Sequence, residues 1–308
     1  MNRVHFIAIG DPDLSKLALA LSKRKNYKIT GSDEKISEPF YSLLKERNLL
    51  PPQDGWSPEK ITKDLQAVVL GPQITMENPE YIKAKQLGVK IYSFPEYLFQ
   101  QTRSKTRIVV AGTNDKVLIA LMIVHVLQQL RLDADYMIRN QNDGSETMIK
   151  LSYESRIAIL VGDEYYTSTI DQRPMFHMYK PHIAILTALY HSQTVQFSSY
   201  DDYLNQFKLF VDKMEVQGRL IYLGSENYYK QIIDKLRRDI VPFSYSLPVS
   251  KVVDGIVNLK YKKNDVPLML GLDTNLSCIE AARIGCRQIG VTDEQFYNSI
   301  KSFDGKLN

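Results

Sequence analysis

The segment 106–118, Thr-Arg-Ile-Val-Val-Ala-Gly-Thr-Asn-Asp-Lys-Val-Leu, constrains the fold more than any other part of the chain. A buried strand over Ile108–Ala111 leads into a tight glycine turn, and a helix that is apolar on all sides begins at Lys116. This is the setting in which a Gly-Lys-Ser/Thr loop binds nucleotide phosphates. Here Asp115 replaces the glycine before the lysine, and Val117 replaces the hydroxyl residue after it. The segment therefore predicts a phosphate-loop fold that has lost its nucleotide chemistry.

Strand and helix patterns alternate along the chain, which is typical of a parallel, doubly wound α/β sheet. The polar segment Gln100–Thr106 has no periodic pattern and marks a domain boundary. The expected strands are Val4–Ile9, Tyr27–Thr30, Ala67–Leu70, Val89–Tyr92, Ile157–Val161, Ile183–Leu186 and Leu220–Leu223, and the expected helices include Leu14–Lys25, Pro79–Leu87, Tyr200–Met214, Asn227–Arg238, Leu276–Ile289 and Asp293–Ser302. We predict an α/β protein with a Rossmann-like domain over 1–103 and a P-loop-type α/β domain over 104–308.

Composition and charge argue against several classes of function. The formal net charge is only +4, and no basic block with interleaved aromatic residues occurs, so nucleic-acid binding has little support. The longest apolar run, Val117–Leu127, is too short to span a bilayer. Cys278 and Cys286 fall on one expected helix about 12 Å apart, beyond disulfide reach. We therefore expect reduced thiols in a cytoplasmic protein with no membrane partner.

Short motifs that point to one family run in a fixed order along nearly the whole chain. They are His5-Phe6-Ile7-Ala8-Ile9-Gly10, Gly31-Ser32-Asp33, Gly71-Pro72-Gln73-Ile74, Asn78-Pro79-Glu80, Ser93-Phe94-Pro95-Glu96-Tyr97-Leu98, Val110-Ala111-Gly112-Thr113, Asp163-Glu164-Tyr165, Tyr179-Lys180-Pro181-His182-Ile183-Ala184-Ile185-Leu186 and Ser302-Phe303-Asp304-Gly305. With these motifs the chain resembles the Mur ligases. The nearest branch joins UDP-N-acetylmuramate to L-alanine or to a recycled murein tripeptide.

The resemblance implies a fold and an activity. Mur ligases have a UDP-sugar domain, a central ATP domain and a C-terminal domain, and this chain resembles the first two, with the C-terminal ligase domain absent. Family members phosphorylate the muramyl carboxylate with ATP, and an amine then attacks the acyl phosphate. Magnesium and a lysine stabilise the charge of the migrating phosphoryl group. ATP and Mg²⁺ are therefore expected as cofactors only where the chain is an active ligase.

By resemblance, the ATP loop is Gly112-Thr113-Asn114-Asp115-Lys116, where the family has Gly-Thr-x-Gly-Lys-Thr-Thr. Asp115 can adopt the left-handed backbone conformation of the glycine it replaces, but its charge opposes a triphosphate. Lys116 is then either a phosphate-binding, catalytic lysine or a solvated lysine in a turn. Thr274-Asn275 aligns with a His-Asn pair on the adenine side of ATP, and Asn275 is also a good N-cap for the next helix.

The family's metal ligands are replaced as well. Its magnesium-binding glutamate aligns with Val161, so Asp163 and Glu164 form either a shifted metal site or a pair of acids that cap a loop. The family's Asp-His pair aligns with Ser192-Gln193. His191, two positions earlier, is either a substitute for the lost histidine or an ordinary surface residue.

The turn after the first strand, Gly10-Asp11-Pro12-Asp13, is altered too. Asp11 as N-cap and Pro12 at the first helical position begin a helix well. Two aspartates at the positive end of a helix dipole, however, repel a pyrophosphate. The family's UDP-sugar residues remain at Gly10, Gly31, Ser32, Asp33 and Asn78. Asp33 lies about 20 residues after this turn, at a position where an acid can hold a ribose or uracil group. UDP-sugar binding therefore stays an open alternative.

Two functions follow from these substitutions. We expect a non-catalytic homologue with a degenerate ATP site that binds a UDP-muramyl precursor or docks onto an active Mur ligase. The other hypothesis is a divergent ATP-dependent ligase that joins UDP-N-acetylmuramate to an amino acid or tripeptide through an acyl phosphate. That ligase would use a shifted geometry that depends on Lys116, Asp163, Glu164 and Asn275.

Overall fold

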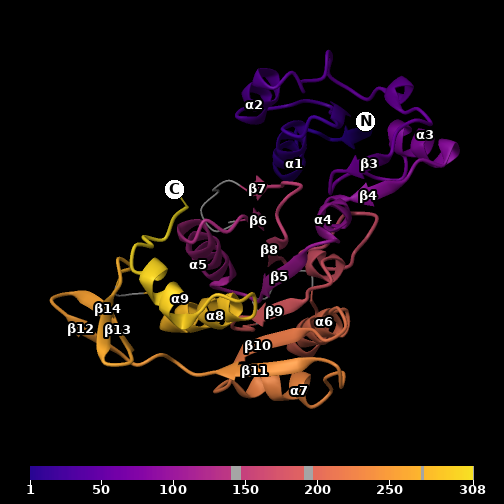
Figure 1. Ribbon diagram of the computed structural model, residues 1–308. Helices are drawn as coiled ribbons and strands as arrows, with labels where there is room; N and C mark the ends of the chain where they lie inside the picture. The colour runs from indigo at the N-terminus through magenta and orange to yellow at the C-terminus, as the bar shows by residue number, and fades with distance from the viewer. Residues whose placement is uncertain (140–146, 191–196, 272–273, 308) are drawn as a thin grey trace. The chain divides into compact units, whose positions relative to one another are not determined.

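The computed structural model describes residues 1–139, 147–190, 197–271 and 274–307, and contacts divide the chain into two compact units (Figure 1). Unit 1 comprises Met1–Gln101, Arg139–Tyr153 and Tyr165–Met178, and unit 2 comprises Thr102–Ile138, Glu154–Glu164 and Tyr179–Asn308. Each unit is thus assembled from separate stretches of chain, whereas the two expected domains are continuous.

Unit 1 contains a parallel sheet in the order β2-β1-β3-β4. Its elements are β1 (Asn2–Ile7), α1 (Pro12–Ser22), β2 (Tyr27–Ser32), α2 (Phe40–Glu46), η1 (Pro58–Lys60), β3 (Ala67–Leu70), α3 (Pro79–Leu87), β4 (Ile91–Ser93) and α4 (Phe94–Thr102). Val4, Phe6, Val68 and Val69 are fully buried in β1 and β3, as expected where a parallel sheet is covered on both faces. The carboxyl end of β1 is followed directly by the turn that begins α1.

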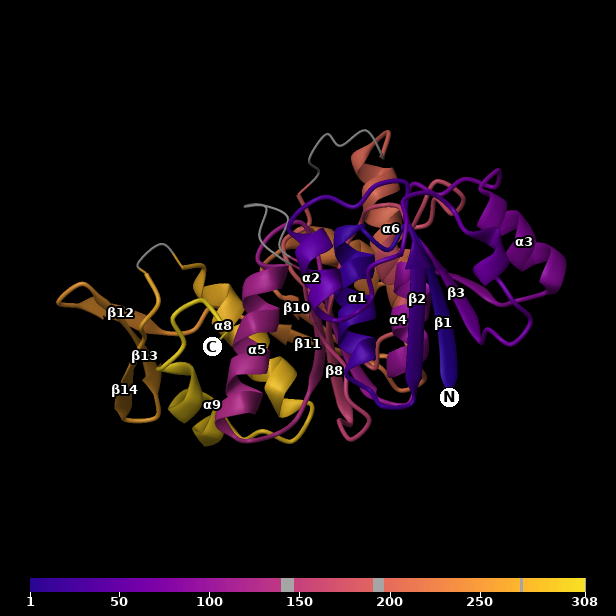
Figure 2. The ribbon, with the colours of Figure 1, turned by 90° about the horizontal axis from the view of Figure 1, so that it is seen from above.

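The larger sheet has the order β11-β10-β9-β5-β8-β6-β7. Its strands are β5 (Thr106–Ala111), β6 (Asp135–Ile138), β7 (Met148–Lys150), β8 (Ile157–Gly162), β9 (Ile183–Leu186), β10 (Arg219–Leu223) and β11 (Val241–Tyr245). Strand β5 pairs in parallel with β8 and β9, and β10 with β9 and β11. In unit 2, α5 (Lys116–Gln129), α8 (Leu276–Arg287) and α9 (Asp293–Ile300) pack together, and α6 (Tyr200–Asp212) lies across the sheet from them (Figure 2). The predicted α/β class is confirmed.

Two parts of unit 2 differ from the expected elements. The helix expected near Asn227–Arg238 is only η3 (Asn227–Tyr229) followed by α7 (Lys230–Ile233), because the charged residues after Ile233 offer no apolar stripe to the core. A separate antiparallel sheet was not expected; it consists of β12 (Ser250–Val253), β13 (Ile256–Tyr261) and β14 (Asn264–Pro267). Asp254 and Gly255 have positive φ angles of 51° and 77° between β12 and β13. An Asp-Gly pair is a hairpin signal that the sequence carries.

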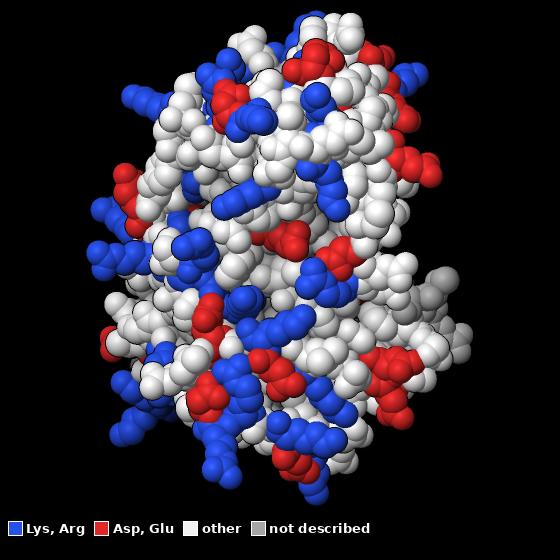
Figure 3. Space-filling view, turned by 90° about the vertical axis from the view of Figure 1, so that its right-hand side faces the viewer, with Lys and Arg blue, Asp and Glu red and all other residues white. Residues whose placement is uncertain are grey.

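Charged side chains of both signs lie on the surface of the molecule. On the face drawn in Figure 3, Lys and Arg are interspersed with Asp and Glu. Within the described part of the chain, no helix is long and apolar enough to cross a bilayer. Cys278 and Cys286 are both free and buried in α8.

Candidate functional site

The loop after β5 keeps the backbone of a phosphate loop. Gly112 has a φ of 144°, and a Cβ atom at this position would lie 2.0 Å from Oγ1 of Thr187, so no other residue fits without movement. Thr113 donates its backbone N–H to the carbonyl of Ala188 at 2.8 Å, and its hydroxyl lies 2.7 Å from the hydroxyl of Tyr203. The loop is therefore held by hydrogen bonds to the segment that follows β9 and to helix α6.

Asp115 occupies the N-cap position of α5 in the left-handed conformation, with φ 65° and ψ −7°. The sequence prediction that aspartate would adopt the angle of the replaced glycine is confirmed. Its side chain caps no backbone N–H of α5 and instead accepts a hydrogen bond from Nδ2 of Asn275 at 2.8 Å. Asn275 also caps α8, since its Oδ1 accepts from the N–H of Ser277 at 3.1 Å. These contacts join the beginnings of α5 and α8.

Lys116 is neither solvated nor open to a ligand. Its Nζ lies 2.7 Å from Oδ1 of Asp163 and 2.7 Å from Oε2 of Glu164, and only 11% of its side chain is exposed. Burial by itself lowers the pKa of Lys116, but the two carboxylates more than offset this effect and raise the pKa above its usual value. We call Lys116, Asp163 and Glu164 the ion triad. The expectation that the two acids cap a loop did not include Lys116. Asp163 and Glu164 follow β8, Lys116 begins the helix after β5, and the three residues meet because β8 and β5 are neighbours in the sheet.

In unit 1, the residues expected to bind a UDP-sugar make hydrogen bonds or packing contacts with one another and with neighbouring residues. Asp33 accepts the N–H of Gly10 at 2.8 Å through Oδ2, and burial raises the pKa of its carboxyl. The hydroxyl of Ser32 donates to buried Glu80. Asn78 is the N-cap of α3 and accepts from the N–H of Glu80 at 2.9 Å.

Gly31 packs against Ile9, where an added Cβ atom would lie 2.6 Å from the Ile9 side chain. All five residues thus have structural contacts, and Gly10 and Asp33 are joined directly by a hydrogen bond.

A pocket of about 300 Å³, here named the precursor pocket, opens at the amino end of α1 within unit 1. The expected Asp11 N-cap is present, and Asp13 is neutralised by an arginine that the sequence did not reveal. Nε of Arg139 lies 3.3 Å from Oδ2 of Asp13, and the hydroxyl of Thr147 donates to Oδ1 of Asp13 at 2.6 Å. Arg139, Tyr165 and Thr167 also line the pocket. The repulsion expected from two aspartates is therefore reduced by one guanidinium.

Asp11 carries less negative charge near neutral pH than an ordinary aspartate. Burial, together with the nearby charge of Asp13, raises the pKa of Asp11 to about 6. The N–H groups of Leu14 and Asp13, and the charge of Arg139, act in the opposite direction and limit the shift. The precursor pocket thus becomes less repulsive to anions as the pH falls toward 6.

No protein-family model matches the chain. It is 25% identical to UDP-N-acetylmuramate--L-alanine ligase of Carboxydothermus hydrogenoformans, over 99% of this chain and 66% of that protein. It is 29% identical to the ligase of the same name from Streptomyces avermitilis, over 72% of this chain and 45% of that protein. A crystal structure of UDP-N-acetylmuramate:L-alanyl-gamma-D-glutamyl-meso-diaminopimelate ligase from Neisseria meningitides superimposes with a TM-score of 0.81 at 19% identity, over 100% of both chains. A murein peptide ligase from Psychrobacter arcticus gives 0.79 at 18% identity, over 98% of this chain and 68% of that one.

Over nearly its whole length the chain is similar to Mur ligases, and it has the fold of solved Mur ligases. It spans 66% and 45% of the lengths of the two curated ligases named above. Its activity therefore has to be argued from its own site residues, since a fold hosts more than one function.

The residues at the Mur ligase nucleotide site do not fit ATP with magnesium. A phosphate loop needs backbone N–H groups, a free lysine and a hydroxyl for the metal. Here Asp115 adds a carboxylate, Lys116 is held in the ion triad, and Val117 has no hydroxyl. Within the described residues, no group of three or more His, Cys, Asp or Glu side chains forms a metal site.

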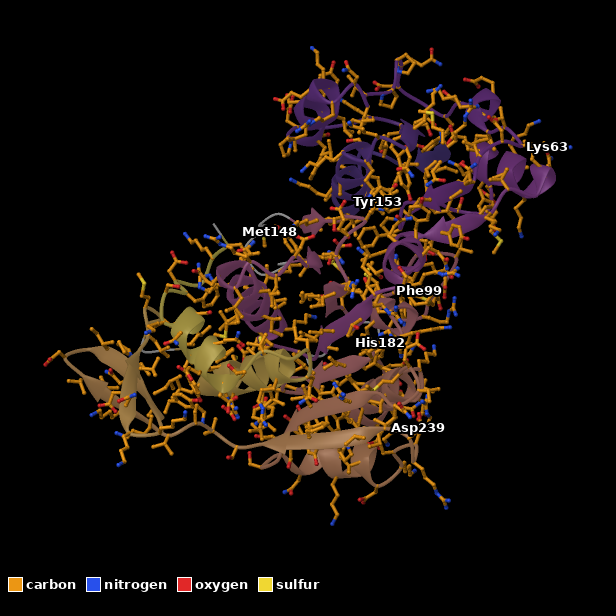
Figure 4. The ribbon with its side chains drawn as sticks, viewed as in Figure 1. Lys63, Phe99, Met148, Tyr153, His182 and Asp239 are labelled. Carbon is orange, nitrogen blue, oxygen red and sulfur yellow. The ribbon has the colours of Figure 1, made fainter. Side chains whose placement is uncertain are left out.

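Two further residues that align with the family, Val161 and His182, have structural surroundings. Val161 is fully buried in β8. His191 and the Ser192-Gln193 pair lie outside the described residues. His182, labelled in Figure 4, is structural, because its Nδ1 accepts the backbone N–H of Arg107 at 3.2 Å. Arg139 gave no sequence signal, since a single arginine after an apolar strand matches no motif.

Proposed function

We propose that this chain is a member of the Mur ligase family that binds a UDP-muramyl precursor of peptidoglycan in unit 1 and does not use ATP in unit 2. The ion triad carries the second half of this proposal. The chain's own carboxylates neutralise the lysine that would otherwise attract nucleotide phosphates. A triphosphate would have to displace two buried acids from Lys116 and would then face Asp115, and both steps oppose binding.

The precursor pocket supports the first half. Anionic groups are favoured near a helix N-terminus, and Arg139 adds a guanidinium suited to phosphate oxygens. Tyr165 and Tyr166 provide ring surface for a sugar or uracil ring. The relatives named for UDP-N-acetylmuramate support the same class of ligand. A precursor-binding protein without ligation chemistry would suit a regulatory role, for example docking onto an active Mur ligase.

A second function, an ATP-dependent ligase of UDP-N-acetylmuramate and an amino acid or tripeptide, is favoured by the names of the relatives, which are ligases. The comparisons support this function more directly than they support a non-catalytic one. Lys116 at the start of α5 is the residue that would serve it. In that case the ion triad must open when nucleotide binds.

Isothermal titration with ATP and magnesium, and separately with UDP-N-acetylmuramate, tests the proposal. We expect heat with the UDP-sugar and none with ATP. Replacing Arg139 by Gln should weaken UDP-sugar binding about tenfold or more, because a charge-assisted hydrogen bond to phosphate is lost. Arg47→Gln, a change at an exposed arginine of the same unit, is the matched control. Micromolar binding of ATP would favour the ligase, and an unaffected Arg139→Gln variant would exclude the precursor pocket.

UDP-sugar binding should also depend on pH. Asp11 has a pKa of about 6 in the free protein, and an anion beside it favours the protonated, neutral form. Affinity should therefore rise as the pH is lowered from about 7.5 to about 5.5, while the pyrophosphate diester stays ionised. The Asp11→Asn variant keeps an N-capping side chain and should bind with a flat pH profile. An unchanged slope in Asp11→Asn would mean that another group causes the dependence.

A further inference from the structure

A second pocket of about 240 Å³ lies wholly within unit 2, at the carboxyl ends of β9, β10 and β11. This edge of a parallel sheet is where ligands bind in open α/β folds. Four of its lining residues are the tyrosines Tyr190, Tyr228, Tyr229 and Tyr245, and we name it the tyrosine pocket. Tyr229 is held firmly, since its hydroxyl donates to the carbonyl oxygens of Leu186 and Thr187 at 3.0 and 2.6 Å. The walls therefore offer ring surface at little cost in side-chain entropy.

The charge on the lining of the tyrosine pocket is negative. Asp115 and Glu226 both line it, and no lysine or arginine is among the described lining residues. Burial raises the pKa of Tyr228 to about 12, and the negative charge of Glu226 adds to this shift. Burial also raises the pKa of the Cys278 thiol, and the negative charge of Asp115 raises it further. A phosphate or carboxylate would be repelled here, whereas a cation would be attracted.

One polar group in the lining has no hydrogen-bond partner among the described residues. Thr187 is 5% exposed, and its Oγ1 makes no hydrogen bond to the described residues. A buried hydroxyl without a partner costs free energy unless something else satisfies it. Thr187 lines the tyrosine pocket, so a ligand with a hydrogen-bonding group can supply the missing contact.

We propose that the tyrosine pocket binds a small aromatic compound that carries an ammonium group and no phosphate. The ring packs against the tyrosines, the ammonium faces Asp115 and Glu226, and the hydroxyl of Thr187 satisfies a polar group of the ligand. Rings and cations are both bound well by tyrosine faces. This site lies in unit 2 and does not depend on precursor binding in unit 1.

Tyramine and 3-(4-hydroxyphenyl)propionate test the proposal, because they share a ring and differ in the sign of their charge. Isothermal titration of the whole chain should give affinity for tyramine at least about tenfold higher than for the carboxylate. Glu226→Gln should reduce this preference, and Glu294→Gln, at an exposed acid of α9 outside the pocket, should leave it unchanged. Equal binding of the two probes, or no binding of tyramine at millimolar concentration, overturns the proposal.

Thr187→Val separates the pocket from general effects on folding. The valine removes a hydroxyl that makes no hydrogen bond within the described part of the chain, so the urea midpoint should not fall. Tyramine binding should weaken severalfold because the ligand loses its hydrogen bond. A variant that unfolds at lower urea and binds tyramine normally would show that the hydroxyl serves the fold, which contradicts the proposal. UDP-N-acetylmuramate is titrated into the same variants as well. Its affinity depends on the precursor pocket in unit 1, so a failure of that pocket is seen separately from a failure of the tyrosine pocket.

Discussion

Replacing Lys116 by methionine should destabilise unit 2 by about 3–5 kcal/mol near neutral pH. Methionine has a similar length but no charge, so Asp163 and Glu164 would remain as two close carboxylates, 1% and 8% exposed, without their cation. Removing one partner from a buried ion pair costs far more than the pair contributes. Urea denaturation followed by circular dichroism measures the loss. Fluorescence of Trp56, the only tryptophan, reports on unit 1 in the same samples.

Two further variants identify the cause of the loss in stability. The triple variant Lys116→Met, Asp163→Asn, Glu164→Gln should recover most of the stability. Lys235→Met, at an exposed lysine of the same unit, should change it little. A stable Lys116→Met protein that has lost ATP binding would contradict the ion triad and favour the ligase.

This experiment bears on function because the two candidate functions make opposite demands on one lysine. A ligase needs Lys116 free to bind phosphate, and its folded state should stay stable when this lysine is replaced. In the geometry found here, the lysine is committed to the fold through contacts at 2.7 Å to two acids. Asp115 likewise keeps the glycine backbone angle but directs its carboxylate to Asn275. The loop keeps the backbone conformation of a nucleotide-binding loop, but its charged side chains contact other residues of the chain.

The sequence predicted the parts of this protein that depend on local patterns. Apolar strands alternating with helices indicated parallel sheets, Asp11-Pro12 indicated the start of α1, and the 106–118 segment indicated the loop and α5. These features depend on neighbouring residues. The substitutions that argue against nucleotide binding were also visible, since Asp115 and Val117 change the charge and the hydroxyl wherever the loop is placed.

The contacts that define the sites were not visible, because they join residues far apart in the chain. Arg139 meets Asp13, and Asn275 meets Asp115, only after the chain has folded. Thr187 became notable only because its buried hydroxyl has no hydrogen-bond partner in the ranges that the structure describes. Pairing of this kind requires the register of the strands, which periodicity does not supply.

Arg107 is the strongest example of a residue that sequence reasoning passed over, and replacing it by lysine should cost unit 2 about 3 kcal/mol or more. Its side chain is fully buried at the start of β5. The guanidinium donates to the carbonyl oxygens of Thr102, Arg103, Lys105, Tyr179 and Lys180 at 2.8 to 3.2 Å. Thr102 and Tyr179 begin two of the stretches that make up unit 2.

The carbonyl contacts, more than the ion pair, should account for that cost. Arg107 Nη2 lies 2.6 Å from Oε1 of Glu215, but the Glu215 side chain is 38% exposed and can be solvated when the pair is broken. An ammonium has three donors and no planar fork, so Arg107→Lys leaves buried carbonyl oxygens without partners. Glu215→Gln should therefore cost only about 1 kcal/mol. Arg156→Lys, at an exposed arginine, controls for the exchange itself. Equal urea midpoints for Arg107→Lys and Glu215→Gln would instead assign the stability to the ion pair.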